Sequence, residues 1–318
     1  MIFEVQILGA NSANFAYGRH QTAQVVNHNE TLFLVDCGEA TQIQMLRYKV
    51  KLMRIAHIFI SHLHGDHYLG LLGLIQTMQL QGRKDALHIY GPPGLDEIIT
   101  VQLRWSDTRL NFPATFHCVE EGPSQLLLDT EHVQVFSIPL QHRVVCNGYL
   151  FKEKPHKRRI IPHAIERFGL HPGQIVALRK GQTIAEEDGT IIATPDEATL
   201  PPPNQRSYAF CSDTIYDETI LPLIEGIDLL YHEATFTHDM VERAAQTFHT
   251  TALQAGHLAL RAGVGRLIIG HFSSRYRDPE VLAEEARTIF ADTSAAAEGE
   301  KYAITFQNQE HELESNLY

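Results

Sequence analysis

The chain has few cysteines and no long apolar run. Its 318 residues contain four cysteines with no CxxC pair among them, which argues against a cysteine zinc site or a disulfide framework and favours buried free thiols. Its apolar stretches are short and interrupted by polar residues, so we expect no transmembrane helix. The segment Met1–Gly9 alternates like a strand and lacks the basic and apolar parts of a signal peptide. These absences predict a cytoplasmic protein without membrane attachment.

Positive charge is also scarce. Lys and Arg total 26 against 38 Asp and Glu, for a net charge of −12, which by itself counts against non-specific binding to polyanions. Histidine, in contrast, is abundant at 19 residues. The positions of these histidines carry much of the functional information.

Short apolar runs rich in β-branched and aromatic residues predict strands. They lie at Phe3–Leu8, Thr31–Val35, Ala56–Ile60, Val133–Ile138, Ser207–Cys211, Ile227–Tyr231, Arg266–Ile269 and Lys301–Phe306. Helical patterns lie between them, at Ala40–Tyr48, Leu69–Gln81, Leu95–Leu103, Thr251–Ala262 and Pro279–Phe290. This mixture predicts an α/β (α+β) fold with helix-covered sheets, and not a simple βαβ repeat.

One segment, from 151 to about 203, differs from the rest. It has little aliphatic periodicity, begins with a run of basic residues and ends at the turn-rich Pro201–Asn204. We interpret it as an insertion that projects from the core, with short elements around Ile160–Phe168 and Ile175–Leu178. A solvated loop with a chance run of charge is the alternative.

The densest group of possible metal ligands lies directly after the predicted strand Ala56–Ile60. The sequence there is Ser-His-Leu-His-Gly-Asp-His, in which His62, His64, Asp66 and His67 are candidate ligands. Strand neighbours two apart share a face, so His62 and His64 can point to one side. Asp66 and His67 then return from the start of the next helix. Imidazole nitrogens and carboxylate oxygens suit zinc, and this cluster can serve two ions close together.

The same arrangement recurs downstream. His142, Asp213 and His271 each come just past the carboxyl end of an apolar strand, where open α/β sheets place their sites. Taken alone, each is compatible with a ligand or with an ordinary polar loop residue. Together with the first cluster they supply seven ligands, about what two zinc ions with open water positions require.

Two further histidines lie in similar surroundings. His232 ends another predicted strand and fits better as a packed residue behind the site than as a ligand. His249 lies just before a predicted helix. Thr250 is the expected N-cap of that helix, so capping explains part of this motif without any chemistry.

The HxHxDH pattern with later His, Asp and His ligands resembles the metallo-β-lactamase superfamily, which implies an αββα sandwich with two zinc ions at one edge. That superfamily includes lactamases, glyoxalases, sulfatases and nucleases, so this resemblance does not select a substrate. Finer matches resemble the ribonuclease Z family and run along the whole chain in the expected order. They are Leu34–Gln42, the continuation Tyr68–Leu74, His232–Thr235 with His249–Thr251, and His271–Tyr276.

The resemblance implies an endoribonuclease that removes the 3′ trailer from precursor tRNA, leaving a tRNA 3′ hydroxyl and a trailer 5′ phosphate. It implies two Zn²⁺ per subunit. The first would be held by His62, His64 and His142, the second by Asp66, His67 and His271, with Asp213 bridging both. Asp66 would also orient the attacking water. His249, held by Glu233, would protonate the leaving 3′ oxygen.

The resemblance also implies that residues 1–318 form a single domain whose insertion is a flexible tRNA-binding arm. Its phosphate contacts would be non-specific and salt-sensitive. The basic residues of this arm are Lys152, Lys154, Lys157, Arg158 and Arg159. The family is typically homodimeric, with one subunit's arm serving the other's active site. The helix Leu69–Leu80 could form the dimer contact, although its periodicity fits a buried core helix equally well.

Two alternatives remain, one enzymatic and one of another class. One is a phosphodiesterase of the same fold that acts on another RNA or on a small phosphodiester, which would need no basic arm. The other is a non-catalytic RNA-binding or scaffold protein. The second is disfavoured because all seven ligand positions, and both Glu233 and His249, are filled.

Overall fold

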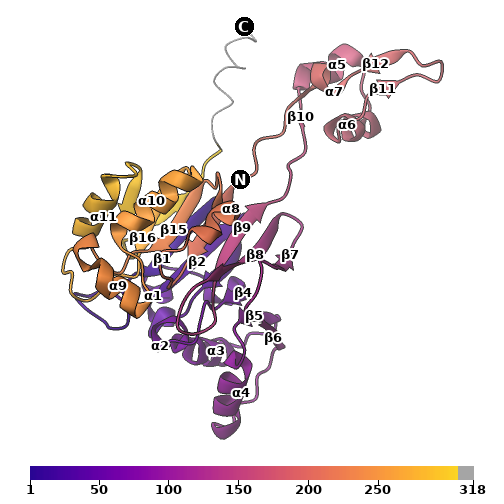
Figure 1. Ribbon diagram of the computed structural model, residues 1–318. Helices are drawn as coiled ribbons and strands as arrows, with labels where there is room; N and C mark the ends of the chain where they lie inside the picture. Colours follow the sequence, from indigo (N-terminus) through magenta and orange to yellow (C-terminus); the bar gives the residue numbers. More distant parts are fainter. Residues whose placement is uncertain (307–318) are drawn as a thin grey trace. The chain divides into compact units, whose positions relative to one another are not determined.

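The computed structural model of the chain, which describes residues 1–306, contains two seven-stranded sheets that enclose most of the apolar core (Figure 1). The first sheet has the strand order β18-β1-β2-β3-β4-β5-β6. Its strands are β1 (Phe3–Gly9), β2 (Ala23–His28), β3 (Thr31–Val35), β4 (Ile55–Phe59), β5 (Leu87–Gly91), β6 (Ala114–Cys118) and β18 (Lys301–Ala303). Strands β3 to β6 run parallel, so their carboxyl ends share one edge.

The second sheet has the order β17-β16-β15-β14-β9-β8-β7. Its strands are β7 (Leu126–Asp129), β8 (Val133–Leu140), β9 (Cys146–Glu153), β14 (Ser207–Cys211), β15 (Leu229–Glu233), β16 (Arg266–Gly270) and β17 (Thr293–Ala295). Strands β14 to β17 are parallel. This sheet therefore also has an edge where several carboxyl ends meet.

Helices cover the outer side of each sheet, which completes the αββα sandwich (Figure 1). On the first sheet these are α1 (Thr41–Arg47), α3 (Gly70–Leu80) and α4 (Leu95–Trp105), which share an apolar cluster with its strands. On the second they are α8 (Leu221–Ile224), α10 (Ala252–Ala262) and α11 (Glu280–Arg287). Two short helices, α2 (Gly65–Tyr68) and α9 (Val241–Thr247), lie in connections.

Residues Glu153–Arg206, with Thr305 and Phe306, form a second compact unit. It contains two small sheets, β10 (Arg159–Ile160) with β13 (Thr199–Leu200) and β11 (Ile184–Ala185) with β12 (Ile191–Ala193). Its helices are α5 (Pro162–Phe168), α6 (Pro172–Arg179) and α7 (Pro195–Ala198). Their buried side chains form a separate apolar cluster. The segment is therefore a small folded unit and not a bare solvated loop.

The strands and helices predicted from periodicity all occur. Thr31–Val35 and Ser207–Cys211 match residue for residue, whereas the predicted strand Lys301–Phe306 ends at Ala303. Among the strands of the two large sheets, the pattern missed β2, β5, β6, β7, β9 and β17. The helix α3 buries Leu71, Leu74, Ile75 and Met78 in the core, so one of its faces is committed to packing.

All four cysteines are free. Three are buried, but the prediction of a buried thiol is wrong for Cys118, which lies exposed at the end of the edge strand β6. Within residues 1–306 no helix has the length and apolar character that crossing a membrane requires.

Candidate metal centre

The seven candidate ligands meet where strands of both sheets end. His62 and His64 follow β4, and Asp66 and His67 lie on α2. The remaining three, His142, Asp213 and His271, follow β8, β14 and β16. Side chains from more than 200 residues of sequence are thus brought together at one place, because the carboxyl ends of the parallel strands converge there.

The cluster contains two main groups that could each hold an ion. His62, His64, His142 and Asp213 form one, and Asp66, His67 and His271 form the other, each with its ligand atoms within 4.8 Å of one another. A third group of the same kind, Asp213, His249 and His271, overlaps with both. In the first, His64 Nδ1 lies 3.0 Å from His62 Nε2 and 3.1 Å from His142 Nε2. Such spacing places nitrogen lone pairs around one small volume.

Asp213 faces both groups. Its Oδ2 lies 3.7 Å from His62 Nε2, while its Oδ1 lies 3.4 Å from His67 Nε2 and 3.2 Å from His271 Nε2. The carboxylate is buried, and Oδ1 has no hydrogen-bond partner. A buried carboxylate oxygen without a partner is costly unless a cation lies next to it. The donor set therefore fits a bound metal ion with a carboxylate between two positions.

Residues behind the cluster fix which ring nitrogen faces it. His67 Nδ1 donates to Asp36 Oδ2 at 2.7 Å, and Asp36 also accepts from the backbone N–H and hydroxyl of Ser61. His271 Nδ1 donates to Thr235 Oγ1 at 2.9 Å. In both histidines Nε2 is then free to act as a ligand, which is the usual arrangement of metal-binding imidazoles.

Two glycines let the segment that carries Asp66 and His67 approach the turn after β3. A Cβ on Gly70 would lie 2.0 Å from the carbonyl oxygen of Gly38, and one on Gly38 would lie 2.6 Å from that of Asp66. The backbone N–H of Cys37 donates to the carbonyl oxygen of His67 at 2.7 Å. Only glycine permits this close approach, so the Leu34–Gln42 segment positions two of the candidate ligands.

The histidines of the cluster differ in the direction in which their pKa values are shifted. Burial lowers the pKa of His62 well below its ordinary value, and burial with neighbouring histidines lowers that of His142 to about 4. Both rings are neutral near pH 7 and can offer a lone pair. Burial also disfavours the charged form of His67, but Asp213, Asp66 and Asp36 outweigh it and raise the pKa well above the ordinary value. Without an ion, the carboxylates of the cluster therefore retain a proton on His67.

His249 and Glu233 form a pair beside this cluster. His249 Nδ1 donates to Glu233 Oε1 at 2.8 Å and lies 3.9 Å from Asp213 Oδ2. The carboxylate of Glu233 also accepts from the N–H of Thr214 and from the N–H and hydroxyl of Thr235. Burial lowers the pKa of His249, but Glu233 and Asp213 outweigh it and raise the value to about 9.

Two residues near the cluster, Thr250 and His232, donate hydrogen bonds to backbone carbonyl groups. The prediction of Thr250 as N-cap of α10 is wrong, since Thr251 caps that helix with a capping box to Gln254, and the Thr250 hydroxyl donates to the carbonyl of Thr214. His232 is fully buried and donates from Nδ1 to the carbonyl of Glu233. It takes no part in the metal groups found among the described residues.

Sequence reasoning missed the roles of Asp36, Ser61 and Thr235. All three lie at strand ends, within the sequence motifs Leu34–Gln42, Ser61–His67 and His232–Thr235. Asp36 also has a positive φ of 54°, which an aspartate tolerates better than most residues. An acidic residue directly after a buried strand was the available signal for it.

The predicted arm residues lie on or beside the second unit. Lys152 is exposed on β9, and Lys157 is exposed in the segment before β10. Arg158 is committed to the unit itself, because its guanidinium pairs with Asp196 and donates to Thr199 Oγ1, both at 2.6 Å. Lys154 is half-buried, and Arg159 is exposed on β10.

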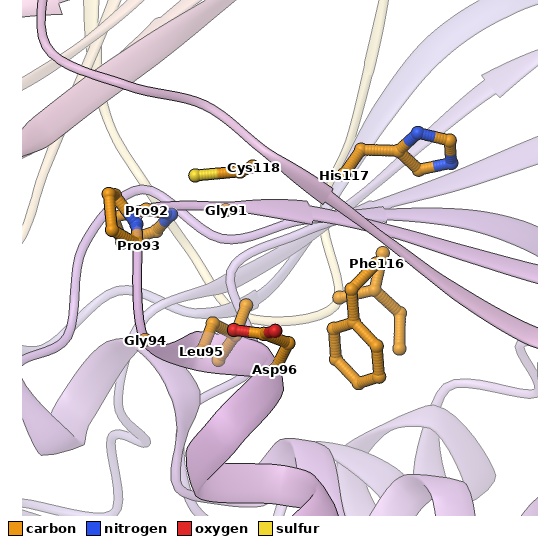
Figure 2. Close-up of a pocket in the computed structure, with 10 residues that line it drawn as sticks. Gly91, Pro92, Pro93, Gly94, Leu95, Asp96, Phe116, His117 and Cys118 are labelled. Atoms are coloured by element: carbon orange, nitrogen blue, oxygen red, sulfur yellow. The ribbon is translucent and has the colours of Figure 1, made fainter.

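A cavity of about 240 Å³ lies between the end of β6 and the first turn of α4 (Figure 2). Its walls come from Ile89, from Gly91–Asp96 and from Phe116, His117 and Cys118. None of the predicted site residues lines it.

Comparisons with known proteins agree with this geometry. The chain is similar to ribonuclease Z of Cytophaga hutchinsonii, with 47% identity over 96% of this chain and 97% of the relative. Among solved structures it is similar to human tRNase Z, short form (ELAC1), with a TM-score of 0.69, 25% identity and coverage of 95% of this chain and 100% of that one. It also resembles the metallo-β-lactamase fold protein YhfI from Bacillus subtilis, with a TM-score of 0.67, 19% identity and coverage of 95% and 98%.

A model of the anti-Pycsar protein Apyc1 family matches residues 3–129 only. The two helix-covered sheets define a metallo-β-lactamase fold protein, as the sequence predicted, and the His/Asp cluster at their strand ends fits metal binding. Within this class, the identity to curated relatives over nearly the full length is decisive. The chain belongs to the ribonuclease Z family.

Proposed function

We propose that the chain is an endoribonuclease that cleaves precursor tRNA at its 3′ end to remove the trailer. The observation that carries this proposal is the complete set of seven donors, bridged by Asp213, in a chain that matches ribonuclease Z relatives over nearly its full length. Products with a tRNA 3′ hydroxyl and a trailer 5′ phosphate follow from the expected placement of the leaving group.

Two zinc ions are the proposed cofactors. His62, His64 and His142 would hold the first, and Asp66, His67 and His271 the second, with Asp213 shared between them. These donors are nitrogens and carboxylate oxygens at compatible spacing, a set that suits zinc. When bound, such ions would activate a water molecule and offset charge on the phosphate oxygens.

The protein's own groups complete the reaction. Asp66 Oδ2 accepts from the N–H of Ala13 at 2.7 Å and lies 3.4 Å from His271 Nε2. Its position is thereby fixed for orienting the attacking water. Because Glu233 holds Nδ1 of His249, the Nε2–H of that ring is the proton available to the leaving 3′ oxygen. A pKa of about 9 keeps this imidazole protonated at neutral pH.

Other parts of the proposal concern assembly. We propose that the unit Glu153–Arg206 acts as the tRNA-binding arm of one catalytic domain, with Lys152, Lys154, Lys157 and Arg159 contacting phosphates. Arg158 would contribute chiefly by holding the arm's fold. We further propose a homodimer that acts in the cytoplasm. The exposed basic side chains in a chain of net charge −12 support a local electrostatic role for this unit.

The test is cleavage of a precursor tRNA with a 3′ trailer. We expect the wild-type protein to make one cut near the discriminator nucleotide and Asp66→Ala to abolish it. A wild type that leaves the precursor intact while hydrolysing bis(p-nitrophenyl) phosphate would instead favour a small-substrate phosphodiesterase.

The arm is tested by replacing Lys154, Lys157 and Arg159 together with alanine. This should weaken binding and reduce the dependence of log Kd on log salt by up to about 0.9 for each lost phosphate contact. The matched control replaces the exposed Lys49, Lys51 and Lys84 of the other unit, which removes the same charge. Equal effects in both triple variants would contradict a specific role for the arm.

A further inference from the structure

The loop between β1 and β2 carries exposed aromatic side chains beside the metal centre. Phe15 and Tyr17 are 47% and 57% exposed. The same loop touches a candidate ligand directly, through the hydrogen bond from the Ala13 N–H to Asp66 Oδ2. Two exposed aromatic rings grouped on one loop next to the metal centre make this loop a candidate interaction surface.

The tip of this loop is a tight hairpin. Ala16 and Arg19 pair across it through two backbone hydrogen bonds, and its central residues Tyr17 and Gly18 have φ angles of 54° and 79°. Turns with two positive φ angles favour Asn, Asp or Gly at both central positions. The backbone at residue 17 is therefore unfavourable for tyrosine, although the ring is more than half exposed.

Basic residues lie on the same loop as the rings and on the loop joined to it. The Arg19 guanidinium lies 5.4 Å from the centre of the Tyr17 ring, and it donates to the carbonyl oxygens of Tyr276 and Arg277. Arg275 and Arg277 are themselves exposed. Arg275 and Arg277 lie on the loop that begins with His271. A backbone hydrogen bond from the Ser12 N–H to the carbonyl oxygen of Phe272 joins this loop to the β1–β2 loop.

The acidic neighbours of this patch are already engaged. Glu298 accepts from His20 and Gln44, and Asp278 caps the backbone N–H of Glu280. In a chain with a net charge of −12, alternating aromatic and basic residues on two joined loops at the catalytic edge are an unusual combination. This combination is typical of surfaces that bind single-stranded nucleic acid, where bases stack on aromatic rings and cations contact the backbone.

We propose that Phe15 and Tyr17 form a stacking platform for an unpaired nucleotide of the RNA beside the scissile phosphate, with Arg275 and Arg277 contacting its backbone. This inference rests on the proposed endoribonuclease function and adds residues that position its substrate. Stacking tolerates any base, so the platform would hold the 3′ region in place without reading its sequence. A second copy of the chain is the competing occupant for the same surface.

The sharpest variant is Tyr17→Asn, because asparagine suits the turn and removes only the ring. We expect its melting temperature to equal or exceed that of the wild type. Its kcat/KM on a trailer-bearing precursor tRNA should fall about 5- to 150-fold, the range that corresponds to one lost stacked base. Phe15→Ala should act in the same direction, and Tyr17→Phe should restore nearly full activity. Trp105→Ala, which removes an 85% exposed ring at the end of α4, is the matched control and should behave as wild type.

A binding measurement separates this proposal from the proposed function. A precursor carrying 2-aminopurine next to the cleavage position, on each side in turn, is titrated with His249→Ala protein. Stacking is expected to quench the fluorescence of 2-aminopurine. If this quenching is lost when Tyr17→Asn or Phe15→Ala is added to the His249→Ala protein, stacking is supported, whether or not the wild type cleaves. Unchanged quenching and kcat/KM within twofold of wild type would overturn the platform. A molar mass of the Tyr17→Asn protein that differs from the wild-type value in light scattering would also overturn the platform, because it would assign the patch to a second copy of the chain.

Discussion

Replacement of Asp36 by asparagine tests how the protein prepares His67 for a metal ion. Asp36 is fully buried, and its Oδ1 accepts from the Ser61 N–H at 2.7 Å, while Oδ2 accepts from His67 Nδ1 at 2.7 Å. An asparagine whose oxygen keeps the Ser61 N–H must direct its NH₂ toward His67. The Nδ1 atom would then have to accept, which moves the ring proton to Nε2 and removes the lone pair that faces the cluster.

The opposite amide orientation is no better, because it sets the NH₂ against the N–H of Ser61. Loss of such a supporting carboxylate typically weakens metal binding by about 10- to 100-fold, or about 1.4–2.8 kcal/mol. We therefore expect Asp36→Asn to fold but to lose metal from the group of Asp66, His67 and His271 first. Activity should return when zinc is supplied in excess.

The assay is competition with a chromophoric chelator, with metal content measured in parallel. Asp228→Asn is the matched control, since Asp228 also accepts from the N–H and hydroxyl of a serine, Ser207, but lies at the start of β15, away from the cluster. Asp36→Asn with wild-type affinity and stoichiometry would refute the reasoning about the ring proton.

Three further predictions concern the same region. His249→Ala should lower kcat by about 10²- to 10⁴-fold with unchanged metal content, and metal loss in that variant would make His249 a ligand instead of a proton donor. The pKa of His67 is raised well above its ordinary value in the metal-free protein. Loading zinc at pH 7 should therefore release a proton, and zinc affinity should fall as pH falls. Calorimetry in buffers of different ionisation enthalpy measures the number of protons released, and a value of zero would contradict the prediction. Thr251→Ala should lower the free energy of unfolding by about 0.5–2 kcal/mol through loss of the α10 cap; a larger loss of stability in denaturant melts of Thr250→Ala would contradict this assignment.

The candidate ligands could be recognised from the sequence because each stands just after a run of apolar residues. His62, His142, Asp213 and His271 share this position, and the periodicity of a buried strand is visible without structure. The fold class followed from the same strands. The strands β5 and β9 were missed because Leu87–Gly91 and Cys146–Glu153 mix polar and apolar residues without regular alternation.

What the sequence did not reveal depends on contacts between distant segments. Asp36 supports His67 only because the turn after β3 lies against α2, and Thr235 supports His271 only because β15 and β16 are neighbours. The choice between Thr250 and Thr251 as N-cap depends on a shift of one residue, which no local pattern resolves. The Tyr17 turn was missed because tyrosine is not a residue that such a turn favours.

The positions of the candidate ligands along the chain determine when, during synthesis, the metal centre can be completed. Its seven candidate ligands extend from His62 to His271, and three of them, His142, Asp213 and His271, follow strands of the second sheet. During synthesis, the first 200 residues contain five of the seven donors, including His142, but lack Asp213 and His271 and so cannot complete either group. Because a ribosome consists largely of RNA, an order of synthesis that leaves the metal centre of a nuclease incomplete until His271 has been added would protect the ribosome during most of that synthesis.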